Sequence, residues 1–256
     1  MADTVDSRTG ALEFSRGAFL TTEGIAVFHK QGLAVASDLH IGFEEALGES
    51  LARMQTRMIL EKFVRVCSSF GIKEILLNGD IKYTFGKESR QEWNEIHFFL
   101  SEIQKLAKIH VIKGNHDFYL ENMVRDFGMQ ILREYETDSA YFTHGDTEIE
   151  KRKGKLTVIG NEHPSIKLRD EIGASKKYPC FLFAKKESIL VLPAVNPWAP
   201  GTDILNVHRK HFLSPILRTV KLDEVRVYPL DGESVYDFKN VRSVRKLILG
   251  NPDFGI

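Results

Sequence analysis

Short apolar runs alternate with longer amphipathic segments over the first half of the chain. The runs are rich in β-branched residues, as in buried strands, and occupy positions 25–28, 33–36, 75–77 and 109–112. Between them, apolar side chains recur every three or four residues, which is typical of a helix with one buried face. These stripes are Leu47, Leu51, Met54 and Met58 within 44–67, and then Trp93, Ile96, Leu100 and Ile103. This β-α-β-α-β series predicts α/β layering.

The second half of the chain has a different pattern. Short strand-like runs at 140–142, 156–159, 181–183, 189–192 and 225–228 follow one another, and long helical stripes are scarce. Consecutive strands of this kind predict a second, mixed or antiparallel sheet packed on the first. The expected fold class is therefore α/β, a four-layer α-β-β-α sandwich of two mixed sheets flanked by helices. With no internal repeat and no low-complexity tract, we expect one domain over residues 1–256, with its core at about 24–235 and an extension at each end.

Composition narrows the class of protein. The 35 Lys and Arg balance the 35 Asp and Glu, so any basic surface must be local. Apolar runs fall far short of about 18 residues, and we therefore expect no membrane span. Two cysteines, Cys67 and Cys180, are too few for a disulfide framework, and the first residues are acidic where a secretory signal is basic. These features together predict a cytoplasmic protein.

Polar residues follow five of the predicted strands at the point where each strand ends. The tetrapeptides or tripeptides there are S-D-L-H at 37–40, N-G-D at 78–80, G-N-H-D at 114–117, T-H-G-D at 143–146 and G-N-E-H at 160–163. Because loops beyond the carboxyl ends of strands in an α/β sheet converge on one crevice, we expect these side chains to lie together.

The mixture of carboxylate, imidazole and amide groups suits a pair of divalent cations. Such a pair needs a shared carboxylate, neutral imidazoles and open positions for water and substrate. A water between two cations loses its proton easily and attacks a phosphoester whose oxygens the same cations hold. The residue types therefore predict a hydrolase site.

The ordered motifs D-x-H, G-D, G-N-H-D, H and G-x-x-H resemble those of the calcineurin-like metallophosphoesterase superfamily. Shorter matches at 79–86, 192–194 and 212–215 are similar to phosphoesterases related to the SbcD repair nuclease and to the DNA-ligase-associated type. The resemblance spans nearly the whole chain, and it leaves no room for the added DNA-binding or capping domains of the larger repair nucleases.

The resemblance implies a role for each matching residue. The first metal would be held by Asp38, His40, Asp80 and His163. The second would share Asp80 as a bridge and use Asn115 and His144. His116 matches the position that contacts substrate and protonates the leaving group, so it is the expected catalytic general acid. We expect Mn²⁺ at both sites, with Mg²⁺, Zn²⁺ or Fe²⁺ as alternatives.

Two positions depart from the family pattern. The closing motif is usually G-H-x-H, and Asn161 here replaces its first histidine. An amide oxygen is a weak ligand for zinc-like ions but acceptable to Mg²⁺ or Mn²⁺, so Asn161 is at most a weak ligand of the second metal, whose site we expect to be weak. Tyr83 stands where relatives carry a His or Asp that positions phosphate or orients the catalytic histidine. A phenol can donate a hydrogen bond but cannot replace a carboxylate in that role.

These residues predict a metal-dependent phosphodiesterase in which hydroxide held between the metals attacks phosphorus. Nucleic acid is a candidate substrate, since residues 151–186 contain ten Lys or Arg against three Asp or Glu. The neutral net charge favours a small phosphodiester instead. A third reading is a degenerate, weakly active or inactive subunit that binds partners in a DNA-repair or RNA-processing complex. The oligomeric state is left open by the sequence.

Overall fold

The computed structural model describes residues 4–5, 9–15, 17–47, 54–169 and 173–250. Its first sheet has eight strands in sequence order: β1 (Thr4–Val5), β2 (Leu12–Ser15), β3 (Ala18–Leu20), β4 (Ala26–Phe28), β5 (Leu33–Ala36), β6 (Glu74–Asn78), β7 (Lys108–Ile112) and β8 (Ile131–Leu132). The strands run antiparallel from β1 to β5 and parallel from β5 to β8. The β-α-β-α-β series predicted from the sequence is therefore confirmed as β5 to β7.

The second sheet is also mixed. Its path is β15-β12-β13-β14-β11-β10-β9, with β16 beside β13. The strands are β9 (Tyr135–Glu136), β10 (Ala140–Phe142), β11 (Leu156–Ile159), β12 (Pro164–Arg169), β13 (Ser175–Ala184), β14 (Ile189–Val191), β15 (Thr202–Asp203) and β16 (Arg226–Pro229). Among these, β10, β11 and β14 are parallel neighbours, so their carboxyl ends point the same way.

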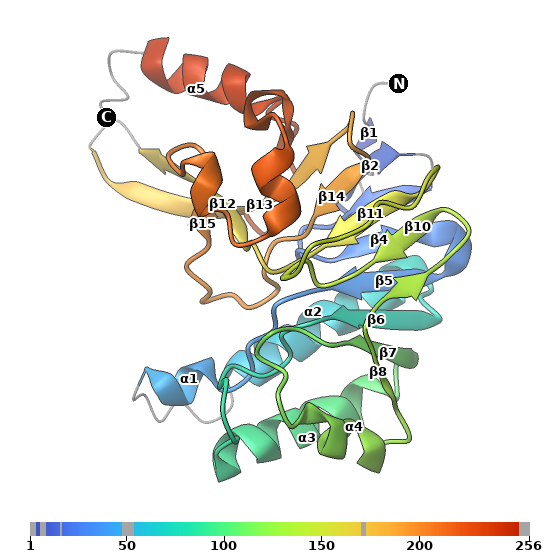
Figure 1. Ribbon diagram of the computed structural model, residues 1–256. Helices are drawn as coiled ribbons and strands as arrows, with labels where there is room; N and C mark the ends of the chain where they lie inside the picture. The colour runs from blue at the N-terminus through green and yellow to red at the C-terminus, as the bar shows by residue number, and fades with distance from the viewer. Residues whose placement is uncertain (1–3, 6–8, 16, 48–53, 170–172, 251–256) are drawn as a thin grey trace.

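Helices cover the outer face of each sheet (Figure 1). The first sheet carries α2 (Met54–Phe70), α3 (Arg90–Ile103) and α4 (Leu120–Asp126), with the short α1 (Phe43–Ala46) beyond the end of β5. A short 3-10 helix, η1 (His29–Gln31), links β4 to β5. The second sheet carries 3-10 helices η2 (Arg209–His211), η3 (Pro215–Thr219) and η4 (Leu222–Glu224), and then α5 (Val241–Gly250). The four-layer α-β-β-α architecture predicted from the sequence is confirmed.

Three hydrophobic clusters fill the spaces between the four layers. Strand side chains alternate between clusters because successive residues point to opposite faces of a sheet. In β6, Leu76 lies between the two sheets, whereas Ile75 and Leu77 pack under the helices. In β14, Leu190 lies between the sheets and Val191 packs on the outer helical layer. Strands buried on both faces explain the continuous apolar runs in the sequence.

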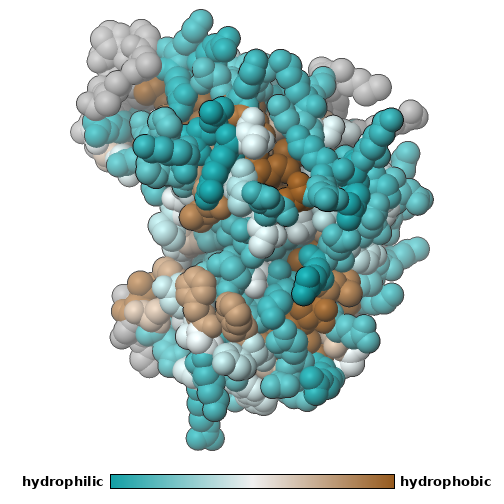
Figure 2. Space-filling model, viewed as in Figure 1, coloured by the Kyte–Doolittle hydropathy of each residue, from teal (hydrophilic) through white to brown (hydrophobic). Residues whose placement is uncertain are grey.

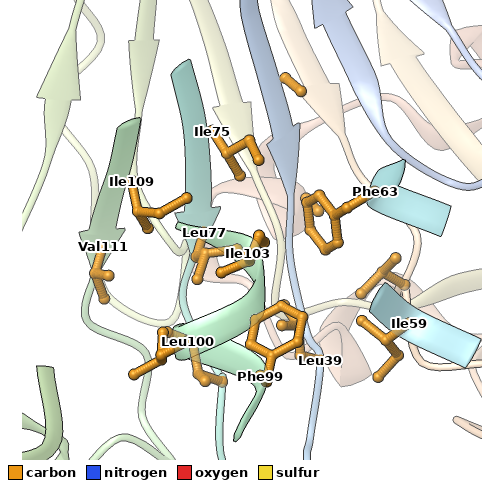
Figure 3. Packing of buried hydrophobic residues seen from close by; sticks show 14 of the residues in the cluster. Leu39, Ile59, Phe63, Ile75, Leu77, Phe99, Leu100, Ile103, Ile109 and Val111 are labelled. Atoms are coloured by element: carbon orange, nitrogen blue, oxygen red, sulfur yellow. The ribbon is translucent and has the colours of Figure 1, made fainter. Parts of the chain in front are cut away.

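The amphipathic stripe expected along 44–67 is wrong in its position. The segment contributes to both α1 and α2. The buried face of α2 runs through Ile59, Phe63 and Val66. Figure 3 shows Ile59 and Phe63 in the same cluster as Ile75 and Phe99. Leu47 is 55% exposed and Met54 is 51% exposed. Met58 is only half-buried, and Leu51 lies outside the described residues. In α3, Ile96, Leu100 and Ile103 are buried as expected, but Trp93 is exposed.

The segment before residue 24 contributes to the first sheet. Leu12 and Leu20 on β2 and β3 are fully buried between the two sheets. No helix in the described ranges is both long enough and apolar enough to cross a membrane.

Candidate metal centre

The five polar loops meet where strands of both sheets end. They follow β5, β6 and β7 of the first sheet and β10 and β11 of the second. Backbone hydrogen bonds join neighbouring loops: the N–H of Asp38 donates to the Gly79 carbonyl at 3.1 Å, and the N–H of Gly160 donates to the His144 carbonyl at 2.9 Å. Across the two sheets, Asn78 Nδ2 donates to the Thr143 carbonyl at 3.0 Å. The convergence predicted from the sequence is confirmed.

Left-handed backbone concentrates in these loops. Among the described residues, eight that are not glycine have a positive φ, and five of the eight belong to the motifs: Asp38, His40, Asp80, Asn161 and His163. Each such residue costs on the order of 1 kcal/mol, and residues of this kind cluster at functional sites. The fold therefore holds the backbone of these five residues in a conformation that is unfavourable for stability.

Two motif glycines are required by close contacts. A Cβ on Gly114 would lie 2.1 Å from Asp80 Oδ1, and a Cβ on Gly160 would lie 1.7 Å from Ser37 Oγ. Real Cβ atoms do not approach other atoms so closely, so any side chain at either position would push the loops apart. The two glycines let the G-N-H-D and G-N-E-H loops pack against the carboxylate loops.

One cluster of ligand atoms is formed by Asp38, His40, Asp80 and His163, whose donor atoms all lie within 4.8 Å of one another. His163 Nε2 lies 3.0 Å from Asp38 Oδ1 and 3.2 Å from His40 Nε2. His40 Nε2 in turn lies 3.8 Å from Asp80 Oδ2. Two imidazole nitrogens that face each other beside two buried carboxylates fit a divalent cation, which accepts lone pairs from all four groups.

A second cluster is formed by Asp80, Asn115 and His144. His144 Nε2 lies 3.4 Å from Asp80 Oδ1 and 3.2 Å from Asn115 Oδ1. The other ring nitrogen, Nδ1, lies 2.9 Å from the Asn78 carbonyl, which accepts a hydrogen bond from its N–H and leaves Nε2 directed at the cluster. The Asp80 carboxylate thus presents Oδ2 to the first cluster and Oδ1 to the second.

In the metal-free chain, protons on imidazole groups offset the negative charge of the buried carboxylates. Burial would raise the pKa of Asp38, but the imidazoles of His163, His144 and His40 hold it far below its usual value. Burial would lower the pKa of His144, but its interaction with Asp80 raises that pKa to about 10. For His40, burial dominates and lowers the pKa to about 4. A divalent cation at the site would displace the proton of His144.

Asn161, expected as a weak ligand of the second metal, contacts a different partner. Its backbone N–H donates to the Asp38 carboxylate at 3.0 Å, and its side-chain Nδ2 donates to Ser214 Oγ at 3.4 Å. In the part of the chain that the structure describes, no hydrogen bond joins its side chain to Asn115 or His144. Its role as a ligand stays a prediction.

His116 lies beside both clusters. Its Nε2 is 3.8 Å from Asp80 Oδ2, and its backbone N–H donates to Asp80 Oδ1 at 2.9 Å. Its Nδ1 contacts the backbone carbonyl of Tyr83, which accepts a hydrogen bond from the ring N–H and fixes the orientation of the ring. The contact with His116 is made by the main chain of Tyr83, while the Tyr83 phenol ring packs against Phe43 at 5.0 Å between centroids.

The loop that carries Tyr83 is held by a buried ion pair that the sequence analysis missed. Glu92 Oε1 accepts from the N–H groups of Tyr83 at 2.9 Å and Thr84 at 2.8 Å. Lys82, whose side chain is fully buried, donates to the carbonyls of Thr84 and Gly86 and lies 3.9 Å from Glu92 Oε2. A lysine two residues after the G-D motif was the only signal in the sequence.

Asp117, the last residue of the G-N-H-D motif, organises the Asp80 loop. Its carboxylate accepts from the N–H groups of Asp80 at 2.8 Å, Ile81 at 2.9 Å, Lys82 at 3.2 Å and Gly114 at 2.9 Å. The residue that caps α4 is Tyr119. Burial, with a further contribution from Asp80, raises the pKa of Asp117 to about 6.

Replacing Asp117 with Asn should lower the free energy of unfolding by about 3 kcal/mol. The amide group places an N–H donor against backbone donors and leaves at least one of them buried without an acceptor. Urea unfolding of metal-free protein measures the effect. Asp126→Asn, at an exposed position at the end of α4, is the matched control and should change stability by less than about 0.5 kcal/mol. Equal stability of the two variants would contradict the role assigned to Asp117.

Comparisons with known proteins identify a family and similar solved structures. The family model of the calcineurin-like phosphoesterase superfamily domain matches residues 32–172, which include every predicted ligand. The crystal structure of the nuclease MPE of Pseudomonas putida has a TM-score of 0.63 at 16% sequence identity, over 92% of this chain and 98% of that one. The phosphoesterase YfcE of E. coli has a TM-score of 0.38 at 17% identity, over 66% of this chain and 84% of that one.

No curated protein sequence matches the chain. The nuclease shares its fold at an identity too low to transfer an activity. The family model covers more than half of the sequence, and the buried Asp and His cluster that it spans is suited to a divalent metal. The chain belongs to the calcineurin-like phosphoesterase superfamily.

Proposed function

We propose that the protein is a metal-dependent phosphodiesterase with two divalent cations centred on Asp80. The observation that carries the proposal is the position of the Asp80 carboxylate, with Oδ2 3.8 Å from His40 Nε2 and Oδ1 3.4 Å from His144 Nε2. One carboxylate that serves two ligand clusters is what a two-metal hydrolase needs.

Each residue of the site has a distinct role in the proposed reaction. Asp38, His40 and His163 would complete the first site with Asp80, and Asn115 and His144 would complete the second. When bound, the cations supply positive charge that activates water and neutralises the phosphate oxygens. His116, held at Nδ1 by the Tyr83 carbonyl, presents Nε2 to the substrate and gives its proton to the departing oxygen as the bond to phosphorus breaks.

A nucleic acid is the substrate we favour. The similar fold from Pseudomonas putida is that of a nuclease. The β12–β13 hairpin, which begins directly after His163, places Lys167 opposite Lys177. Part of the basic stretch at 151–186 is neutralised, because Arg152 pairs with Glu134 and Lys155 with Glu136. We therefore expect the hairpin to contact the phosphates of the substrate. The cytoplasmic location and the preference for Mn²⁺ stay predictions.

The contact of Asn161 with Ser214 favours one alternative. If the second metal does not bind, the chain would serve as an interaction subunit of a repair or RNA-processing complex. Against this alternative, a scaffold has no need of the carboxylates of Asp38 and Asp80, which are costly to bury.

Metal titration of the wild-type chain and the Asn161→His variant tests the proposal. Metal-stripped protein is titrated with Mn²⁺, Mg²⁺ and Zn²⁺, and the number of bound ions per chain is measured. Hydrolysis of the diester bis(p-nitrophenyl) phosphate and of the monoester p-nitrophenyl phosphate is measured at each step. We expect diester cleavage that needs metal, and about tenfold tighter binding of the second ion in Asn161→His, because imidazole is the stronger ligand. One bound ion per chain and no turnover with any metal would favour the interaction subunit.

A further inference from the structure

Phe85 is a large apolar side chain that the fold leaves exposed beside the metal centre. It is 58% exposed, although a buried phenylalanine would favour folding. It belongs to the loop that Lys82 and Glu92 hold from within, so its position is fixed by buried contacts. In Figure 2, exposed hydrophobic residues lie below the hollow on the left side of the molecule. An aromatic ring held on a braced loop is suited to stacking with a ligand.

The ring of Phe85 lies over the imidazole of His116. The two centroids are 3.6 Å apart and the ring planes differ by 32°. The edge of the same imidazole carries Nε2, which lies 3.8 Å from Asp80 Oδ2. One face of Phe85 therefore covers the general acid, and its other face is turned to solvent.

The position of His116 determines which part of a substrate reaches Phe85. The proton of His116 goes to the departing oxygen, so that oxygen must bind at Nε2. The group attached to the departing oxygen then leaves the centre along the imidazole, past Phe85. The group that stays on phosphorus lies on the side of the metals.

We propose that Phe85 forms a subsite for the nucleobase of the leaving nucleoside, which stacks on its exposed face. This inference rests on the proposed phosphodiesterase function and names the side of the substrate that gives selectivity. Every base offers a flat ring for stacking, so the subsite selects a nucleoside leaving group and discriminates little among base types.

Kinetics with matched dinucleotides test the subsite. The substrates are thymidylyl-thymidine and its two abasic analogues, which lack the base on the 5′ or the 3′ side but keep the scissile bond and its alkoxide. For wild-type enzyme we expect kcat/KM to fall about 5- to 100-fold with one analogue, the one that lacks the leaving base. In the Phe85→Ala variant, kcat/KM for the full dinucleotide should fall by a similar factor. Its kcat/KM for the analogue that lacks the leaving base should equal that of wild type.

The variants separate stacking from support of His116. Phe85→Leu keeps an apolar cover on the imidazole but offers no ring, so it should behave as Phe85→Ala does towards the base. The Leu247→Ala variant, exposed on α5, should match wild type on every substrate. Equal losses on the full and abasic substrates would overturn the subsite and make Phe85 a support of His116. No turnover of any diester by wild-type enzyme would remove the proposed function and the subsite together.

Discussion

Replacing Asp80 with Asn should remove metal binding and lower phosphodiester turnover by about 10³-fold or more. One Asp80 oxygen serves each ligand cluster, so the variant weakens both sites at once, and the cations supply several kcal/mol of transition-state stabilisation. The fold should survive, because Asn keeps an oxygen that accepts the His116 N–H and matches Asp in size. Metal content after dialysis and kcat with saturating Mn²⁺ measure the two effects.

The same variant has a signature in stability that needs no activity. In the metal-free chain, the pKa of His144 is raised from 6.5 to about 10, chiefly by Asp80 against the effect of burial. A raised histidine pKa gives stability that is fully present below pH 6.5 and is lost as the pH rises towards 10. Metal-free wild type should therefore lose stability over that range, and Asp80→Asn should lose much less. Asp138→Asn, at an exposed position, is the control. An unchanged metal content in Asp80→Asn would contradict the bridging role.

The convergence of the five polar loops could be predicted from the sequence because local signals determine it. A buried strand followed by Asp, His or Asn can be read from a few residues, and parallel strands bring such ends together whatever the details of packing. Asp38, Asp80 and His144 come from two sheets, yet each could be assigned from its own loop and from the family order of the motifs. The ligand assignments themselves stay predictions until metal binding is measured.

Other features depend on contacts that no local pattern encodes. Lys82 would ordinarily be read as a solvated charge, and only the fold of its loop brings Glu92 and two carbonyls around its ammonium group. The buried face of α2 was misplaced because Leu47 and Met54 form a helical stripe as regular as that of Ile59 and Phe63. Which stripe faces the sheet depends on how α2 packs on the strands, and periodicity does not reveal that packing.

Replacing His116 with Ala should lower turnover of dinucleotides about 10²- to 10⁴-fold and leave metal content unchanged. A nucleoside alkoxide is a poor leaving group, and its departure needs the proton that His116 holds. Nitrophenolate leaves without a proton, so the same variant should lose much less activity on bis(p-nitrophenyl) phosphate. The ratio of the two losses is the measurement, taken at saturating Mn²⁺.

This ratio separates proton donation from the other effects of removing His116. Loss of the ring also removes a neighbour of Asp80, and a change in phosphate binding of that kind would slow both substrates to the same extent. His211→Ala, at an exposed position on η2, should leave both rates unchanged. If His116→Ala slows the nitrophenyl and dinucleotide substrates equally, His116 positions the phosphate, and the proton of the leaving group must come from another donor such as water. If it slows only the dinucleotide, His116 supplies the proton of the leaving group.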